Sequence, residues 1–182
     1  IRVNAVSALS SIGDNRASGT ILNALKSKNI NIRQAAVVAS GDLAIKEAVG
    51  ILIPIIKNMN EQSSLRATSA EALGKIGDKS ASPVLSERLA DKNETDAVWI
   101  KLAESAGKLH TAPIPGWVSE RAQNTWESVS VRSAALMALS GTGNSQDFDI
   151  VLKSLDDGTK EIRSASALAL GNSGNKTAIQ PL

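Results

Sequence analysis

LRATSAEALGKIGD, at residues 65–78, has the pattern of a helix followed by a turn. Positions 0, 4, 7 and 8 of the stretch carry apolar or small residues and fall on one helical face. These residues are Leu65, Ser69, Ala72 and Leu73. Small side chains on that face let a second helix backbone approach closely. Gly77 is suited to the left-handed residue that ends a helix. The stretch therefore predicts half of a tightly packed helical hairpin.

The same pattern recurs along the whole chain with steps of 31 or 33 residues. An aliphatic residue opens each of six units, and Arg follows it in five of them. The openings are Ile1, Ile32, Leu65, Val98, Val131 and Ile162. Seven residues later, each unit has a small side chain, from Ala8, Ala39, Ala72, Ser105, Ala138 and Ala169. A fixed period of this length predicts a repeat array.

Capping and turn residues recur in the same register. Asn29, Thr95, Ser128 and Thr159 lie three residues before an opening aliphatic, where an N-cap is expected. Twelve residues after the aliphatic come Gly13, Gly77, Gly143 and Gly174, and the next position carries Asp14, Asp78, Thr111, Asn144 and Asn175 as caps for a second helix. That helix has an aliphatic residue at offset 20 in every unit, ending with Leu182. Each unit is thus predicted as helix, turn, helix and polar loop.

These stretches resemble the short bacterial HEAT repeat, the kind named after phycobilisome lyases. The resemblance covers essentially the whole chain. It implies an all-α fold, a right-handed α-solenoid (superhelix) of about six HEAT-like helical hairpins with truncated terminal units. We expect one array over residues 1–182, with units beginning near 1, 32, 65, 98, 131 and 162. The chain starts inside a first helix and stops inside a second, so flanking domains or further repeats are expected.

Composition excludes several classes of function. The chain has no Cys, which removes disulfides, thiolate zinc sites and cysteine nucleophiles. Twenty basic residues against 18 acidic ones give a net charge of +2, so no strong field for nucleic acid is expected. The longest apolar run, residues 48–56, is broken by Gly50 and Pro54, and no membrane insertion is expected. No signal peptide is visible, and the compartment stays open.

No catalytic, cofactor or metal site is predicted. His110 is the only histidine and stands at a predicted turn. Deoxyhypusine hydroxylase, an iron enzyme of the same fold, is recognised by paired His-Glu motifs, but here Thr111 follows the histidine. The recurring arginines are expected to be structural, bridging loop carbonyls or an acidic side chain of the neighbouring unit. They are Arg2, Arg33, Arg66, Arg132 and Arg163.

The fourth unit departs from the pattern. Trp99 replaces the arginine, and His110 replaces the turn glycine. Two prolines within residues 112–116 predict that the second helix starts late, near Pro115 or Gly116. All three tryptophans of the chain lie in this unit. Two interpretations stay open, namely large side chains that fill gaps in a degenerate repeat, or a binding role.

A candidate partner site follows from the row at offset 19 of each unit. The row includes Ile51, Val84, Trp117 and Ile150, flanked at offset 22 by Glu87, Glu120 and Lys153. The resemblance implies that the second helices line the concave face, where these residues would form an apolar stripe edged with charge. We expect Trp117 to be partly exposed there as an anchor. The alternative is that the row is partly buried between neighbouring second helices.

The leading hypothesis is a non-catalytic scaffold that binds a protein or peptide through its concave face. A chromophore or cofactor lyase-type subunit is an alternative suggested by family analogy. A third is a nucleic-acid-repair module like the HEAT-like alkylpurine glycosylases, which use a basic concave channel. This chain has the tryptophans but not the excess positive charge, so no nucleic acid is expected as a partner.

Overall fold

The structure is a computed structural model that describes residues 3–179. Every regular element in this range is helical. The α-helices are α1 (Val3–Ile12), α2 (Ser18–Leu25), α3 (Ile30–Asp42), α4 (Val49–Lys57), α5 (Ser63–Ile76), α6 (Ser82–Leu89), α7 (Asp96–Lys108), α8 (Trp117–Gln123), α9 (Val129–Ser140), α10 (Ser145–Lys153) and α11 (Lys160–Asn172). Short 3-10 turns are η1 (Asn15–Ala17), η2 (Lys46–Ala48), η3 (Lys79–Ala81), η4 (Ser154–Asp156) and η5 (Lys176–Ile179). The predicted opening at Ile1, Arg2 and the offset-20 residue Leu182 lie outside the described residues.

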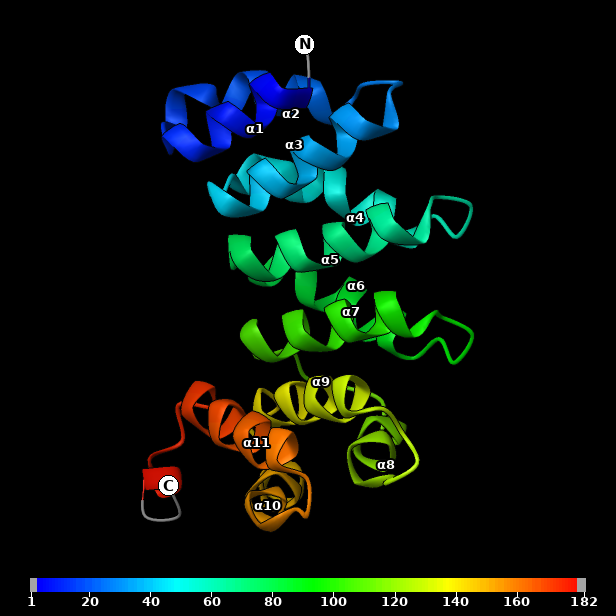
Figure 1. The fold of residues 1–182 in the computed structure, drawn as a ribbon, viewed down its shortest axis with the longest axis vertical. Helices are drawn as coiled ribbons and strands as arrows, with labels where there is room; N and C mark the ends of the chain where they lie inside the picture. Colours follow the sequence, from blue (N-terminus) through cyan, green and yellow to red (C-terminus); the bar gives the residue numbers. More distant parts are fainter. Residues whose placement is uncertain (1–2, 180–182) are drawn as a thin grey trace.

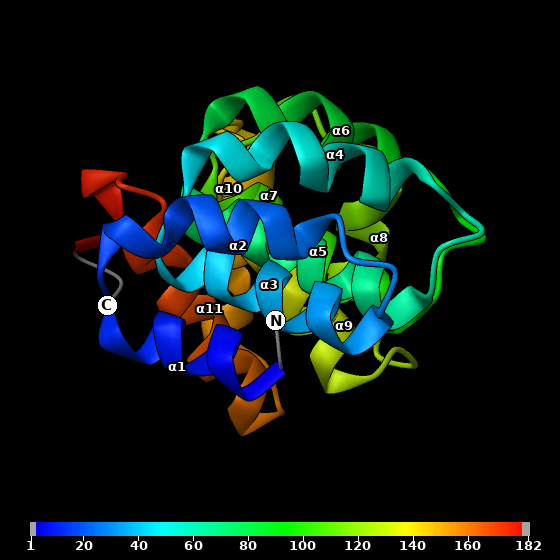
Figure 2. The same cartoon turned by 90° about the horizontal axis from the view of Figure 1, so that it is seen from above.

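The helices stack in two layers along one axis (Figure 1). The odd-numbered helices, which carry the opening aliphatic residues, pack on one another in sequence. Each even-numbered helix packs on the odd-numbered helix that follows it, as α4 does on α5 and α8 on α9. Viewed down the stack, α4 and α6 lie on one side and α1 and α9 on the other (Figure 2). The chain is therefore an α-solenoid, as predicted.

Small residues bring the odd-numbered helices close together. A Cβ added to Gly41 would lie 2.9 Å from the Cα of Ala72, so α3 and α5 meet backbone against backbone there. A Cβ on Gly107 of α7 would overlap the carbonyl oxygen of Met137 on α9. Ala72 and Ala138 are buried, which confirms their expected place in the seam. Among the even-numbered helices, only the pairs α4–α6 and α8–α10 pack closely within residues 3–179.

The two layers differ in how closely their helices approach. The odd-numbered helices meet backbone against backbone at small residues, whereas the even-numbered helices carry bulkier buried side chains such as Leu52 and Leu85. That the second helices line the concave face stays a prediction.

The turn after each first helix has one geometry throughout. Gly13, Gly77, Gly143 and Gly174 have φ between 67° and 76°, which confirms the predicted left-handed residue. The two units without glycine use the same conformation, with φ of 49° at Ala44 and 50° at His110. His110 is therefore a turn residue, as expected, although it adopts a conformation that favours glycine.

The predicted caps are confirmed in part. The side chains of Asn29 and Ser128 accept hydrogen bonds from backbone N–H groups of the first turn. Thr95 and Thr159 occupy N-cap positions without a side-chain cap bond. Before four of the second helices, a side-chain oxygen accepts a hydrogen bond from the backbone N–H two residues further on. These residues are Asp14, Asp78, Asn144 and Asn175. Thr111 does not cap, because α8 starts only at Trp117 after N-cap Gly116, which is the late start that was predicted.

Candidate protein-interaction surface

Three loops between the layers share one turn, which we call the Asx-x-x-Glu turn. They join α4 to α5, α6 to α7 and α8 to α9, and read Asn58–Glu61, Asp91–Glu94 and Asn124–Glu127. In each, the first side chain accepts a hydrogen bond from the N–H two residues on, at 2.9–3.1 Å. The N–H of each glutamate also donates to the carbonyl of the first residue, at 3.0–3.1 Å for Glu61 and Glu127 and 3.3 Å for Glu94. The first two turns project from the same edge of the array in both views (Figures 1 and 2).

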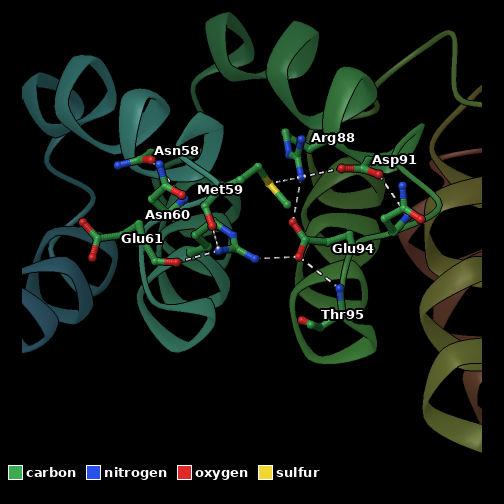
Figure 3. A network of polar contacts seen from close by, with 10 residues as sticks. Asn58, Met59, Asn60, Glu61, Arg88, Asp91, Glu94 and Thr95 are labelled. Carbon is green, nitrogen blue, oxygen red and sulfur yellow. Dashed lines mark hydrogen bonds and ion pairs between the residues drawn. The ribbon is translucent and has the colours of Figure 1, made fainter.

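The glutamate of the turn points inward and binds arginine. Glu94 accepts from the Nη2 atoms of Arg66 and Arg88, each at 2.8 Å, and from the N–H of Thr95 at 3.0 Å (Figure 3). Its side chain is only 1% exposed. Burial acts to raise the pKa of Glu94, but the hydrogen bonds from Arg66, Arg88 and Thr95 outweigh it and hold that pKa below its usual value. Arg66 also donates to the carbonyl oxygens of Met59 and Glu61.

The other recurring arginines behave alike. Arg33 pairs with Glu61 at 2.8 Å. Arg132 pairs with Asp157 and donates to the carbonyl of Ala122. Arg163 donates to the carbonyl of Asp157 at 2.8 Å. Within the described residues the arginine row is therefore structural, as expected, and joins each first helix to the adjacent loops.

The fourth unit replaces this arrangement with an aromatic one. Trp99 is fully buried and lies against Trp117, with ring centroids 5.5 Å apart. The guanidinium of Arg121 lies 4.3 Å from the Trp99 ring centroid and donates to both carboxylate oxygens of Glu127. It also donates to Asp96 at 2.6 Å. Arg121 on α8 thus holds the glutamate that an arginine at position 99 would hold.

A cleft of about 530 Å³ lies between the α6–α7 turn and α8. Its lining is Lys92, Glu94, Asp96, Trp117, Glu120, Arg121, Asn124 and Glu127. Trp117 is partly exposed, as predicted, and the Lys92 ammonium lies 5.8 Å from its ring centroid. Glu94 and Glu127 have both oxygens engaged by arginine. Exposed Glu120 has no ion pair among the residues that the structure describes.

Trp126 lies in the turn between α8 and α9, which contributes to the lining of this cleft. It is 95% exposed and lies between Asn124 and Glu127, two residues of the lining. Its backbone N–H donates a hydrogen bond to the side-chain oxygen of Asn124, with 3.0 Å between the two atoms. The other two Asx-x-x-Glu turns carry Asn60 and Asn93 at the same position. Among the repeats Trp126 is only one of three tryptophans of the fourth unit, whereas an alignment of the three turns shows tryptophan in place of asparagine.

The structure gathers only part of the predicted partner site. Trp117 and Glu120 line the cleft. Val84 is only 4% exposed, so its expected place on an open stripe is wrong, and the alternative of burial in the stack holds for it. Ile51 and Ile150 are partly buried against the core. Of the flanking charges, Glu87 pairs with Lys57 at 2.8 Å, and Lys153 is exposed. A continuous exposed apolar stripe is therefore not formed.

Residues 3–179 contain no group of three or more His, Cys, Asp or Glu side chains arranged to hold a metal ion. Over the same range, no helix combines the length and the apolar character that crossing a bilayer would demand.

Comparison with known proteins places this arrangement among helical-repeat folds. A family model described as HEAT repeats matches residues 18–103. The helices on either side of this match continue the same stack, so the fold of the chain is that of a HEAT-like repeat array. A comparison with curated proteins finds no match.

Solved structures share the fold at low sequence identity. A chain in the complex of CpcE and CpcF of phycocyanin lyase from Nostoc sp. PCC7120 aligns with a TM-score of 0.67 at 24% identity, over 88% of this chain and 66% of that one. Human deoxyhypusine hydroxylase in complex with glycerol aligns with a TM-score of 0.53 at 17% identity, over 98% and 69% of the two chains. An archaeal HEAT-like repeats protein from Thermococcus onnurineus NA1 gives 0.51 at 15% identity, over 95% and 80%.

Proposed function

We propose that this chain is a non-catalytic scaffold that binds a protein or peptide partner at the edge formed by Trp126 and the adjoining cleft. The observation that carries the proposal is Trp126, whose side chain is 95% exposed in a turn that is otherwise built like its neighbours. The two sister turns carry the polar Asn60 and Asn93 at the same position. A tryptophan there exposes a large apolar ring to water without contributing to the core.

The geometry of the turn favours binding. The Asn124 side chain and the Glu127 N–H fix the backbone on either side of Trp126. Less conformational freedom of the backbone is then lost when a partner covers the ring, which lowers the entropic cost of association. Tryptophan is also the side chain most enriched among residues that dominate binding energy at protein interfaces. Trp117 and Glu120 in the cleft would extend the contact.

The other predicted residues have a secondary place in this proposal. Ile51, Ile150, Glu87 and Lys153 lie on the even-numbered helices, outside the cleft. They would meet only a partner that extends along that layer. The expected absence of nucleic acid as a partner rests on the near balance of charge.

The test replaces Trp126 by the residue of its sister turns. Wild type, Trp126→Asn and the control Asn93→Ala are used to capture proteins from native lysate, and retained amounts are quantified. We expect at least one protein to be retained by wild type and control and reduced about 30-fold or more with Trp126→Asn, as removal of an interface anchor worth about 2 kcal/mol requires. The stability of Trp126→Asn should change by less than about 0.5 kcal/mol. Equal retention by all three proteins would contradict the proposal.

A lyase-type subunit is the second candidate function. The observation that favours it is the structural likeness to a chain of the phycocyanin lyase complex, although identity is only 24%. The complex contains two different proteins, CpcE and CpcF, so this candidate also involves a protein partner. Titration with a free tetrapyrrole tests it, because binding would shift the visible absorbance of the pigment. An unchanged absorbance spectrum at millimolar protein would exclude the lyase-type candidate and leave only the scaffold proposal.

A further inference from the structure

We propose that the cleft beside Trp126 receives a lysine or arginine side chain of the partner, which therefore presents a basic residue next to an apolar one. This inference rests on the proposed function and specifies the chemistry of the partner. It uses three features of the cleft, namely its free carboxylates, its aromatic wall and the position of Trp126.

The carboxylates of the cleft are not all satisfied. Arg121 is shared by Glu127 and Asp96, so one guanidinium faces two carboxylates. Only Oδ1 of Asp96 is engaged, and the Asp96 side chain is 61% exposed. Glu120, one turn into α8, is exposed and has no ion pair within residues 3–179. Free acceptors for a cation therefore remain along the wall formed by α8 and the start of α7.

The aromatic wall also favours a cation. Lys92 lies 5.8 Å from the centroid of the Trp117 ring, within the range of a cation–π contact. Lys92 is exposed and makes no ion pair among the described residues, so an incoming guanidinium or ammonium can take its place at low cost. Arg121 shows that the same pair of rings already binds a guanidinium, at 4.3 Å from Trp99 and 5.6 Å from Trp117.

The same features disfavour an anionic ligand. A phosphate or carboxylate in the cleft would meet Glu120 and the free oxygen of Asp96. The positive charges that could receive it are few, because Arg121 is engaged by Glu127 and Asp96, leaving Lys92. A volume of about 530 Å³ is enough for one long basic side chain and part of its backbone. Trp126 is exposed in the same turn as two lining residues, and under this proposal its ring contacts the apolar neighbour of that side chain.

The test is a selection from a random 12-residue peptide library displayed on phage, carried out on the full chain. Glu120→Lys reverses one free charge of the cleft. Glu161→Lys makes the same change at an exposed glutamate of α11, outside the cleft, and serves as the control. Binding of the selected peptides is then measured by fluorescence anisotropy. Both variants are checked for a wild-type circular dichroism spectrum.

We expect wild type and Glu161→Lys to enrich peptides in which Lys or Arg adjoins an apolar residue. Their affinity should fall about tenfold with Glu120→Lys and stay within about twofold with Glu161→Lys, as loss of one partly exposed charge pair predicts. Enrichment of acidic or neutral peptides, no enrichment, or affinity unaffected by Glu120→Lys would overturn the inference. If the captured protein still depends on Trp126 in any of these cases, the scaffold proposal survives and only the basic character of its partner is wrong.

Discussion

The third and fourth units use different residues at the same place in the array. In the third, Arg66 and Arg88 converge on Glu94, and the carboxylate is almost fully enclosed. In the fourth, Trp99 fills the position of Arg66, and Arg121 alone reaches Glu127, whose side chain is 24% exposed. Both arrangements fix the Asx-x-x-Glu turn to the helices beneath it.

The difference shows that arginines from different positions can anchor the glutamate of the Asx-x-x-Glu turn. The arginine can come from the first helix or, as in the fourth unit, from the second. Replacing Arg by Trp99 also provides the surface on which Trp117 and Arg121 pack. Trp117 and Arg121 also form part of the lining of the cleft.

The largest effect should come from Trp99→Ala. It removes a fully buried indole and the ring beneath Arg121, so we expect a loss of about 3–5 kcal/mol of unfolding free energy. Urea unfolding with matched m-values gives the measurement. Trp126→Ala is the control, with an expected change under about 0.5 kcal/mol. A loss below about 1 kcal/mol for Trp99→Ala would show that the aromatic arrangement does not hold the fourth unit together.

Substitution of the anchored glutamate should destabilise the third unit more than the fourth. Glu94→Gln leaves Arg66 and Arg88 buried without their shared charge, and we expect a loss of about 3 kcal/mol. Glu127→Gln should cost about 1 kcal/mol, because the pair is more exposed and Arg121 keeps Asp96 and the two rings. Thermal and urea unfolding of both variants provide the comparison. Equal losses would mean that burial of the glutamate does not distinguish the two units.

The seams between first helices should differ by a smaller amount. Gly107→Ala places a methyl against the backbone carbonyl of Met137, which cannot move without shifting α9, and we expect a loss of about 2 kcal/mol. A Cβ on Gly74 would lie 2.5 Å from Oγ, 2.8 Å from Cβ and 3.0 Å from Cα of Ser105, so its nearest backbone neighbour is farther away than the Met137 oxygen is from a Cβ on Gly107. Gly74→Ala should therefore cost less, about 1 kcal/mol, because the backbone overlap is smaller and alanine favours the helix. The reverse order would show that the α7–α9 seam is the looser one.

The smallest expected effect is on the pH dependence of the free energy of unfolding, through Glu94. The pKa of Glu94 is lower in the folded state than its usual value. Its contribution to stability is therefore present above the unfolded-state pKa of about 4.3 and is lost as pH falls through the folded-state pKa. Glu94→Gln should flatten the stability profile below about pH 4.3 relative to wild type. Glu120→Gln, at an exposed glutamate without an ion pair, is the control for removing one charge.

The helical array could be predicted because its signals are local and repeated. Small residues in the seam and glycine in the turn follow from backbone sterics, which each unit repeats in the same register. Ala44 and His110 were harder to foresee as left-handed residues, because only the neighbouring helices force that conformation on them. Which layer forms the concave face depends on the curvature of the whole array, and that is a property of packing rather than of one repeat.

The candidate site was predicted in part for a related reason. Trp117 and Val84 share offset 19, but Trp117 is the first residue of α8, whereas Val84 is the third residue of α6 after η3. The late start of α8 therefore breaks the equivalence on which the stripe relied. Trp126 was missed because the repeats were aligned on their helices, whereas its significance lies in the register of the loops.

The uneven packing of the two layers has a mechanical consequence. The first helices meet backbone against backbone, as at Gly107 and Gly141, and such a seam resists compression. On the other side, α6 and α8 lack the close packing that joins α4 to α6 and α8 to α10 within residues 3–179. We therefore expect bending of the array to concentrate between α6 and α8, where tension would separate these two helices. A partner that binds both walls of the cleft would connect the α6–α7 turn to α8 and restrict this bending.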